Sequence, residues 1–301
     1  MNTINVLPED DDKSRFFIGC VGYEARSVEA LKHFLMTDPS PESALIFDYN
    51  SEGSTYISNK KLLDDRGVRG IDCFEVFLRE IVSLLLTHND RFSLDVSSLD
   101  REKIARILQA FFFHAKEGCS LRMVYYPSCF YEPERRLEEV TSFGPVTPAF
   151  IGVTDLACSN TKLILGAGFE YGRAVSAIDL LEPSETFCYY PAGTDPRFEI
   201  AIRDNNLDFS FLGPGDQLLA YDLLDPRSLF FDLMSSLSNF IEVGNVIILP
   251  LGPKIFAAVS IVAALCHHPH VMVWRHSVKQ KRAMDRDIVA SGERVCFTVG
   301  F

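Results

Sequence analysis

An internal duplication is the feature of this sequence that most constrains its fold. GYEARSVEAL (22–31) and GFEYGRAVSAI (168–178) both read Gly, aromatic, Glu and then Arg, and their first glycines, at 22 and 168, lie 146 positions apart. Each motif follows an apolar, strand-like run and opens a helix-like segment. The same turn at the start of two helices predicts two equivalent structural units.

The rest of the two halves matches in the same order. Each half continues with a strand that ends in Tyr, three residues, Gly and a hydroxyl residue. An apolar helix, a strand–helix pair, another strand and a Gly-flanked closing strand follow. Any two α/β units share this alternation of strands and helices. The repeated sequence motifs are an additional similarity, and they predict a duplication of the whole chain. The matched segments are 46–55 and 188–195, 74–86 and 225–237, 92–112 and 246–265, 121–128 and 270–277, and 144–152 and 292–300.

The predicted strands are near-continuous apolar runs, such as FFIGCVG, LILGAG and VIILPL. Such runs are typical of parallel strands that helices cover on both faces. Each half reads strand, helix, strand, helix, strand, helix, strand and a last strand, which predicts parallel pairing through right-handed crossovers. We therefore expect an α/β fold of two tandem Rossmann-like units related by a pseudo-twofold duplication. The predicted repeats are 1–152 and 153–301, with a seam near 145–162.

Composition and charge exclude several classes of function. The net charge of −12 argues against binding of extended nucleic acid through a broad basic face, but it allows a small anionic ligand. The N-terminus carries no secretory signal, and the longest apolar stretch, 255–266, is too short to span a membrane and predicts a buried helix. Eight cysteines without a CxxC pair predict reduced thiols in a cytoplasmic protein.

The sequence predicts neither a metal site nor a cofactor. Cys266, His267, His268 and His270 stand close together, but neighbouring side chains on one segment cannot all reach the same ion. A complete GxGxxG, a GxxxxGK[ST], an HExxH and a GxSxG motif are all missing. No acidic cluster indicates two-metal phosphoryl transfer.

The repeated motifs fall where ligands bind in doubly wound sheets, beyond the carboxyl ends of the strands. A helix start offers N–H groups and a dipole to an anion, and an Arg beside it can clamp a phosphate. A Glu there can accept from a ribose hydroxyl or a base amine. Alternatively, it pairs with the Arg and stabilises its own helix. The candidates are Gly22, Tyr23, Glu24, Arg26 and Ser27 in the first half and Gly168, Phe169, Glu170 and Arg173 in the second.

The loop after the third matched strand differs between the halves. Gly252 and Lys254 open a helix in the second half and offer a cation to a phosphate. In the first half the same loop carries Asp95, Ser97 and Ser98, which bind a ligand or, alternatively, cap the helix. Such divergence predicts an asymmetric ligand, or chemistry in one half only.

Two further sets of residues are weaker candidates. Small residues after the second strands allow a ligand to approach closely, or form a plain turn. Aromatic and basic residues at the fourth strands can stack on nucleobases, or belong to an interface core. The first set is Asn50, Gly53, Gly193 and Thr194, and the second is Tyr125, Tyr126, Arg135, Trp274, Arg275 and His276.

The segment LPLGPKIFAAVSIVAAL, with Gly252 and Lys254, resembles the last-helix motif of CARF domains, which are Rossmann-like sensors of cyclic oligonucleotides in CRISPR defence. Two such units in one chain resemble the related SAVED domain of antiphage signalling. The resemblance covers nearly the whole chain, but CARF domains usually have Gly-Gly-Thr-Lys where this chain has Leu-Gly-Pro-Lys, and the first half lacks the Lys. It implies a sensor that acts on a separate effector protein, since the two repeats leave no room for an effector domain.

Three functions remain open at this point. The leading hypothesis is a module that binds a nucleotide-like anion, such as a cyclic oligonucleotide, between its two halves and signals to a partner protein. The second is an enzyme acting on a nucleotide or phosphosugar as a glycosidase, ribosyl transferase or cyclic-nucleotide-cleaving enzyme, with Glu24 or Glu170 as the acid/base. The third is a structural subunit of a larger complex.

Overall fold

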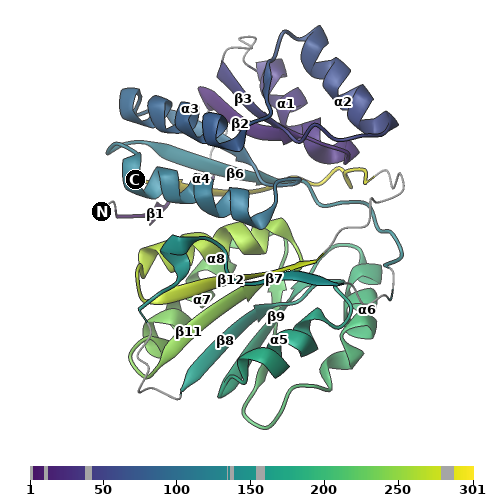
Figure 1. The fold of residues 1–301 in the computed structure, drawn as a ribbon, viewed down its shortest axis with the longest axis vertical. Helices are drawn as coiled ribbons and strands as arrows, with labels where there is room; N and C mark the ends of the chain where they lie inside the picture. Colours follow the sequence, from purple (N-terminus) through teal and green to yellow (C-terminus); the bar gives the residue numbers. More distant parts are fainter. Residues whose placement is uncertain are drawn as a thin grey trace. The chain divides into compact units, whose positions relative to one another are not determined.

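The computed structural model describes residues 3–9, 13–37, 43–133, 135, 139–153, 160–278 and 288–301 (Figure 1). The chain folds into two compact units, Met1–Cys129 with Arg282–Phe301, and Phe130–Lys281. Each unit contains one mostly parallel sheet whose strands alternate with helices. The predicted fold class, two similar Rossmann-like α/β units, is confirmed.

The first unit is built on a seven-stranded sheet in the order β1-β13-β6-β5-β2-β3-β4. Strands β6, β5, β2, β3 and β4 run parallel to one another. Strand β13 is antiparallel to β6, and β1 is antiparallel to β13. The strands are β1 (Asn5–Val6), β2 (Phe16–Val21), β3 (Ala44–Asp48), β4 (Gly70–Ile71), β5 (Arg91–Asp95), β6 (Ser120–Tyr125) and β13 (Val295–Gly300). The helices are η1 (Ala25–Val28), α1 (Glu29–Thr37), α2 (Ser54–Asp65), α3 (Phe74–Thr87) and α4 (Arg101–His114).

The second unit repeats this plan on a six-stranded sheet in the order β10-β9-β8-β11-β12-β7. Only β7 is antiparallel to its neighbour, β12. The strands are β7 (Val140–Pro145), β8 (Thr161–Gly166), β9 (Glu185–Ala192), β10 (Gln217–Asp222), β11 (Asn245–Pro250) and β12 (Val271–Val278). The helices are η3 (Pro148–Phe150), α5 (Arg173–Leu181), α6 (Pro196–Asn205), η4 (Leu207–Phe209), α7 (Pro226–Phe240) and α8 (Lys254–Cys266).

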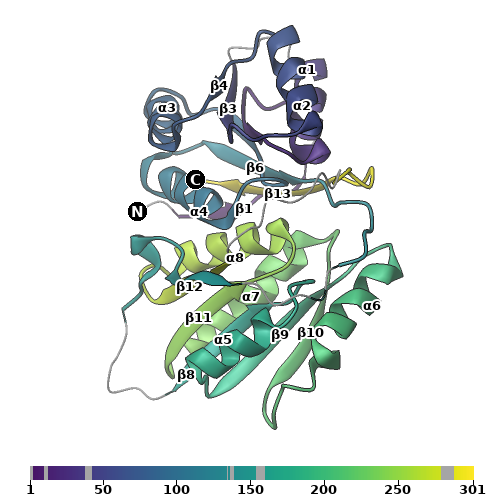
Figure 2. The same ribbon diagram turned by 45° about the vertical axis from the view of Figure 1, so that its right-hand side comes forward.

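Helices cover both faces of each sheet (Figure 2). In the first unit, α3 and α4 pack together on one face, and α1 packs on the other, where Phe34 contacts Phe17 of β2. In the second unit, α7 packs against α8, and α5 and α6 bury residues in the core on the opposite face. All residues from Ile255 to Leu265 of α8 are buried, which confirms the buried helix predicted there.

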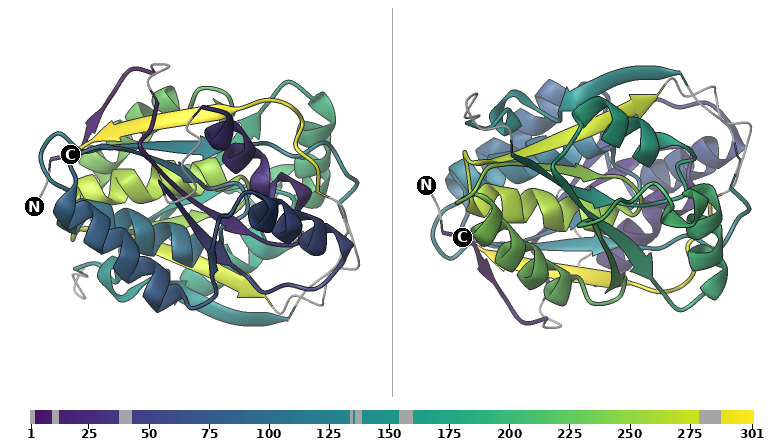
Figure 3. Two further views of the ribbon diagram at one scale, coloured as in Figure 1. Left: turned by 90° about the horizontal axis from the view of Figure 1, so that it is seen from above. Right: turned by 90° about the horizontal axis from the view of Figure 1, so that it is seen from below.

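The two units are not the consecutive halves of the chain, so the predicted boundary at 152/153 is wrong. The strand after β6, β7, joins the second sheet, and the last strand of the chain, β13, joins the first. The yellow β13 arrow can be followed into the first sheet in Figure 3. Both strands pair antiparallel with the fifth parallel strand of a sheet, so their local patterns do not reveal which sheet each one completes. Part of the predicted seam, residues 154–159, lies outside the described residues.

Each unit also contains one helix–strand pair that the sequence pattern missed. These are α2 with β4 in the first unit and α6 with β10 in the second. Only Asn59 and Leu63 of α2 are buried, and β4 has two residues, so neither element produces a strong apolar pattern.

Candidate functional site

Each sheet reverses its strand order at one point, and the repeated motifs lie there. In the first unit the chain passes from β2 outward through β3 to β4 and then returns to place β5 on the other side of β2. In the second unit β8, β9 and β10 are laid down in the same way before β11 returns to pair with β8. Ligands of open α/β sheets bind beyond the carboxyl ends of the strands at such a switch point. The loops after β2 and β5, and after β8 and β11, are therefore the candidate sites.

In the first unit, Glu24 joins the two switch-point loops. Its Oε2 accepts hydrogen bonds from Arg26 Nε at 2.7 Å and from the Ser98 hydroxyl at 3.0 Å. The Arg26 side chain is 10% exposed and also donates to the Tyr126 carbonyl at 3.0 Å. Burial alone would lower the pKa of Arg26, but Glu24 and Tyr125 stabilise the cation and raise it. The Glu–Arg pair that the sequence offers as an alternative to ligand binding is therefore present.

In the second unit, Glu170 makes the equivalent connection. Its Oε1 and Oε2 lie 3.0 and 3.2 Å from the backbone nitrogen of Gly252, in the loop before α8. A Cβ on Gly168 would collide with the Cα of Gly252 and with the Glu170 carboxylate. Gly252 has φ +70°, and a Cβ there would lie 2.5 Å from the Ala167 carbonyl oxygen. These two glycines therefore let the loops pack backbone to backbone.

The positions of the two glutamates in their sheets are equivalent. Ile18 of β2 pairs with Leu94 of β5, and Ile164 of β8 pairs with Ile248 of β11. Glu24 and Glu170 each lie six residues after the first member of their pair. Their hydrogen-bond donors, Ser98 and Gly252, each lie four residues after the second member. The repeated motif thus places one carboxylate at each switch point, where it ties the loop of the first strand to the loop of its neighbour.

A buried acid distinguishes the first unit. Asp95, the last residue of β5, is 1% exposed, and its Oδ1 accepts from the Ser97 N–H at 2.8 Å. Burial raises the pKa of Asp95 to about 6, against the hydrogen bonds from Ser97 and the charge of Arg26, which lower it. The residue at the same position of β11 is Leu249, which is fully buried. An acid with a perturbed pKa beside Glu24 and Arg26 is the kind of feature that clusters at functional sites.

The aromatic residue of the repeated motif also differs between the units. Phe169 stacks on Phe198 with ring centroids 5.3 Å apart and planes at 15°, and Tyr131 packs edge-on against it at 5.7 Å. Its counterpart in the first unit, Tyr23, is 38% exposed. The second unit therefore packs its motif aromatic against two other rings, whereas more than a third of the Tyr23 surface is exposed.

Buried asparagines hold both motif loops, and the sequence reading missed them. Asn59 of α2 donates through Nδ2 to the carbonyls of Gly22 at 3.1 Å and Glu24 at 2.9 Å, and to the Ser27 hydroxyl at 3.2 Å. In the second unit, Asn205 and Asn206 donate to the carbonyls of the matching loop, at Phe169 and Gly168. Asn59 lies in the middle of α2, whereas Asn205 and Asn206 lie at the end of α6, so an alignment of the two halves does not match them. A polar residue on the buried side of a helix is the one available indication.

Several other predicted residues lie near the strand ends and at the helix starts. Asn50 has φ 46° and donates its N–H to Asp48 at 2.8 Å, and Gly53 precedes α2 with φ 110°. These two residues therefore shape the turn after β3. The exposed Gly193 and Thr194 lie in the corresponding turn before α6, and the partly buried Arg173 and Lys254 are the first residues of α5 and α8.

The alternative role of Asp95 and Ser98 as helix caps is wrong. Asp100 is the residue that caps α4, accepting from the Lys103 N–H at 2.9 Å. Since Asp95 and Ser98 do not serve the helix end, their contacts in the switch-point cluster are the interactions that the structure assigns to them.

The residues at the fourth strands contribute mainly to packing. Tyr125 is buried beneath Arg26, whose guanidinium carbon lies 5.8 Å from the ring centroid, and Tyr126 is half-buried. In β12, Trp274 and His276 pack edge-on against Phe143 of β7, next to the half-buried Arg275. Arg135 pairs with Asp204 at 3.1 Å.

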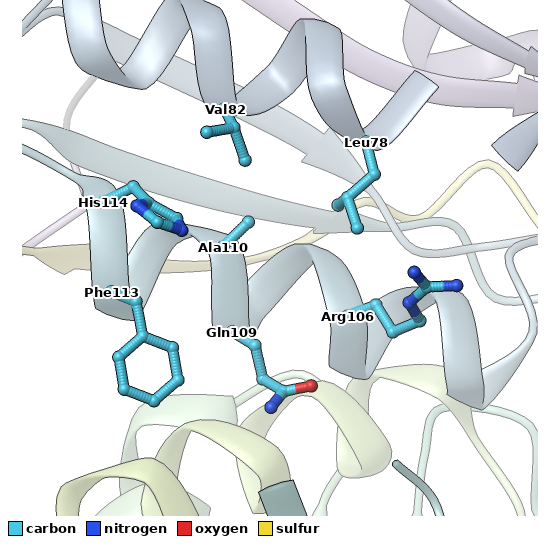
Figure 4. A pocket seen from close by; sticks show the side chains of 7 residues that line it. All are labelled: Leu78, Val82, Arg106, Gln109, Ala110, Phe113 and His114. Atoms are coloured by element: carbon cyan, nitrogen blue, oxygen red, sulfur yellow. The ribbon is translucent and has the colours of Figure 1, made fainter. Parts of the chain in front are cut away.

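A shallow pocket of about 200 Å³ lies between α3 and α4 of the first unit (Figure 4). Side chains of Leu78 and Val82 point toward α4 there, and the remaining lining residues come from α4 itself: Arg106, Gln109, Ala110, Phe113 and His114. Because it lies between two helices and contains none of the predicted site residues, this pocket is separate from the switch point.

Within the described ranges, no group of three or more His, Cys, Asp and Glu side chains is arranged to hold a metal ion. In the same part of the chain, no helix has the length and apolar character needed to cross a membrane. Comparison with models of known protein families and with curated proteins finds no match for this chain. Its function must therefore be inferred from the geometry of the site.

Proposed function

We propose that this protein binds a nucleoside-containing small molecule, such as a nucleotide, at the switch point of its first unit. The observation that carries the proposal is the asymmetry of two otherwise equivalent sites. The second unit has Leu249 and a Phe169 that stacks on Phe198, where the first has buried Asp95 and exposed Tyr23. A buried acid costs stability, and such a cost is typical of sites retained for function.

The side chains divide the recognition between them. Tyr23 offers an aromatic face for a base, and such stacking contributes about 1–3 kcal/mol per base. The Glu24 carboxylate accepts from a ribose hydroxyl or a base amine, while Arg26 and Ser98 hold it in place. Binding by Glu24 would pull on the loops after β2 and β5 together, which gives a ligand a route to change the unit and signal to an effector protein. This role agrees with the resemblance to CARF and SAVED sensors.

A thermal-shift titration of the whole chain tests the proposal, with adenosine, AMP, a cyclic dinucleotide and inorganic phosphate as probes. A ligand at a hundred times its Kd stabilises a protein by about 2.7 kcal/mol. Glu24→Gln keeps the shape but weakens acceptance, so it should reduce the shift. Glu170→Gln is the matched control at the equivalent position of the second unit and should retain it.

The outcomes separate the alternatives. A shift with adenosine and AMP that only Glu24→Gln reduces supports the site in the first unit. A shift with phosphate alone, or an equal loss in both variants, would contradict it. The absence of any shift would reject a nucleoside ligand.

One observation favours the enzyme as a second candidate. The pKa of Asp95, about 6, is close to the range that general acids and bases use, and Asp95 interacts with both Glu24 and Arg26. In such an enzyme Glu24 would be the acid/base, and Asp95 would interact with it through its charge. Mass spectrometry of each ligand after incubation tests this: turnover that Glu24→Gln abolishes identifies an enzyme, whereas an intact ligand identifies a binding protein.

A further inference from the structure

The sheet edges of the two units are protected to different degrees. In the first unit the edge strands β1 and β4 have two residues each. In the second unit, β7 carries Gly144 and Pro145, and its pairing with β12 shifts register at Ser277/Val278. Short strands, prolines and irregular pairing are the usual protection against edge-to-edge association. By contrast, β10 has six residues, QLLAYD, in continuous register with β9 and without Pro, Lys or a bulge.

The backbone of β10 has donors and acceptors that point away from its sheet. Leu223 donates its N–H to Ala192 of β9. Because backbone groups alternate along a strand, the N–H and C=O groups of Leu218, Ala220 and Asp222 point to the open side. All three residues are exposed. The strand itself lies at the edge of its sheet (Figure 2).

We propose that β10 pairs antiparallel with β10 of a second copy of this chain, so that the two second-unit sheets join into one. A twofold axis at Ala220 brings the two outward-facing Ala220 residues together in a hydrogen-bonded pair. Leu219 then lies opposite Tyr221 of the partner subunit, an aliphatic–aromatic pair, and Leu218 lies opposite Asp222 of the partner subunit.

Charge selects this register over its neighbour. An axis at Leu219 would place Asp216 directly opposite Asp222 of the partner subunit, and like charges in that arrangement are destabilising. The axis at Ala220 avoids this contact. The strand is thus compatible with itself in the Ala220 register, and this self-compatibility favours a second copy of the chain over an unrelated peptide partner.

Exposed apolar side chains accompany the open edge. Leu218 is 37% exposed, Leu224 in the next turn is 42% exposed, and Phe231 of α7 is 51% exposed. All three belong to β10 or to the segment that directly follows it, and α7 packs against β10. Self-pairing would remove Leu218 from water as it satisfies the open backbone groups.

Sedimentation equilibrium of the full chain, measured over a wide concentration range, tests the proposal. We expect a dimer that Leu218→Glu weakens at least about tenfold, because the new carboxylate would lie directly opposite Asp222 of the partner subunit. Leu180→Glu is the control, since Leu180 is an exposed leucine of α5, away from β10. Circular dichroism establishes that both variants are folded.

Cysteine crosslinking tests the register. Facing residues of a hydrogen-bonded antiparallel pair have Cα atoms about 5.5 Å apart, which permits a disulfide. Ala220→Cys should therefore crosslink two copies on oxidation, while Gln217→Cys, which faces Leu223 of the partner subunit, should not. The unsubstituted chain measures background from its exposed Cys73 and Cys129. A monomer at every concentration, a dimer that Leu218→Glu leaves unchanged, or crosslinking no better through residue 220 than through residue 217, overturns the proposal.

Discussion

Replacement of Asp95 by Asn tests the buried acid at the first switch point. Burial raises the pKa of Asp95 from 3.8 to about 6. An acid whose folded pKa is raised favours the folded state only while it is protonated. Its contribution is therefore fully present below about pH 4 and is lost as the pH rises through about 6. The shift of about 2 units corresponds to about 3 kcal/mol of unfolding free energy that ionisation of Asp95 removes.

The asparagine variant should be free of this loss. Asn has the same shape and can still accept from the Ser97 N–H, but it does not ionise. Measured by urea unfolding, the variant should gain stability over the unsubstituted chain as the pH rises. Linkage puts about 1 kcal/mol of that relative gain between pH 5.0 and pH 7.5. A constant difference between the two proteins across this range, or a relative loss in the variant, would refute the reasoning.

Three further changes test the architecture. Gly168→Ala should lower the unfolding free energy by about 1–3 kcal/mol in urea titrations, because its methyl group would push apart the two loops that Glu170 joins; an unchanged midpoint would contradict this. Asn59→Ala should cost about 1–3 kcal/mol by the same assay, since it leaves buried carbonyls of the motif loop without their donor, and a neutral result would mean that another donor replaces it. Residues 1–129 joined by a short turn to 288–301 should fold alone and show a cooperative thermal transition, whereas 1–152, which lacks β13, should not; folding of the latter would contradict the strand exchange.

Much of the fold could be predicted from local patterns. Near-continuous apolar strands and the repeated motif indicated two α/β units, and the strongly apolar segment 255–266 proved to be the buried helix α8. The pair α2 and β4 was missed because one is weakly amphipathic and the other has two residues. The domain boundary was misplaced because β7 and β13 have similar neighbours and exchange sheets.

The candidate site was predicted in part. The motif placed Glu24 and Glu170 beyond the first strands, and the sheet order then brought them to the switch points. Whether a glutamate meets a side chain or a backbone could not be read from the motif, because Ser98 and Gly252 lie on other loops. No sequence motif or spacing indicated that Asn59 would contact the motif loop.

The sequence by itself determined the repeat, the α/β class and the placement of Glu24 and Glu170 just after β2 and β8, since these follow from residues close together in the chain. Only the tertiary structure decided that Glu24 contacts Ser98, that Asp95 is buried, and that β13 returns to the first sheet. The physical reason is that burial and strand pairing depend on contacts between distant segments. A local pattern can indicate that a strand will form, but its partner is chosen by the free energy of the whole fold.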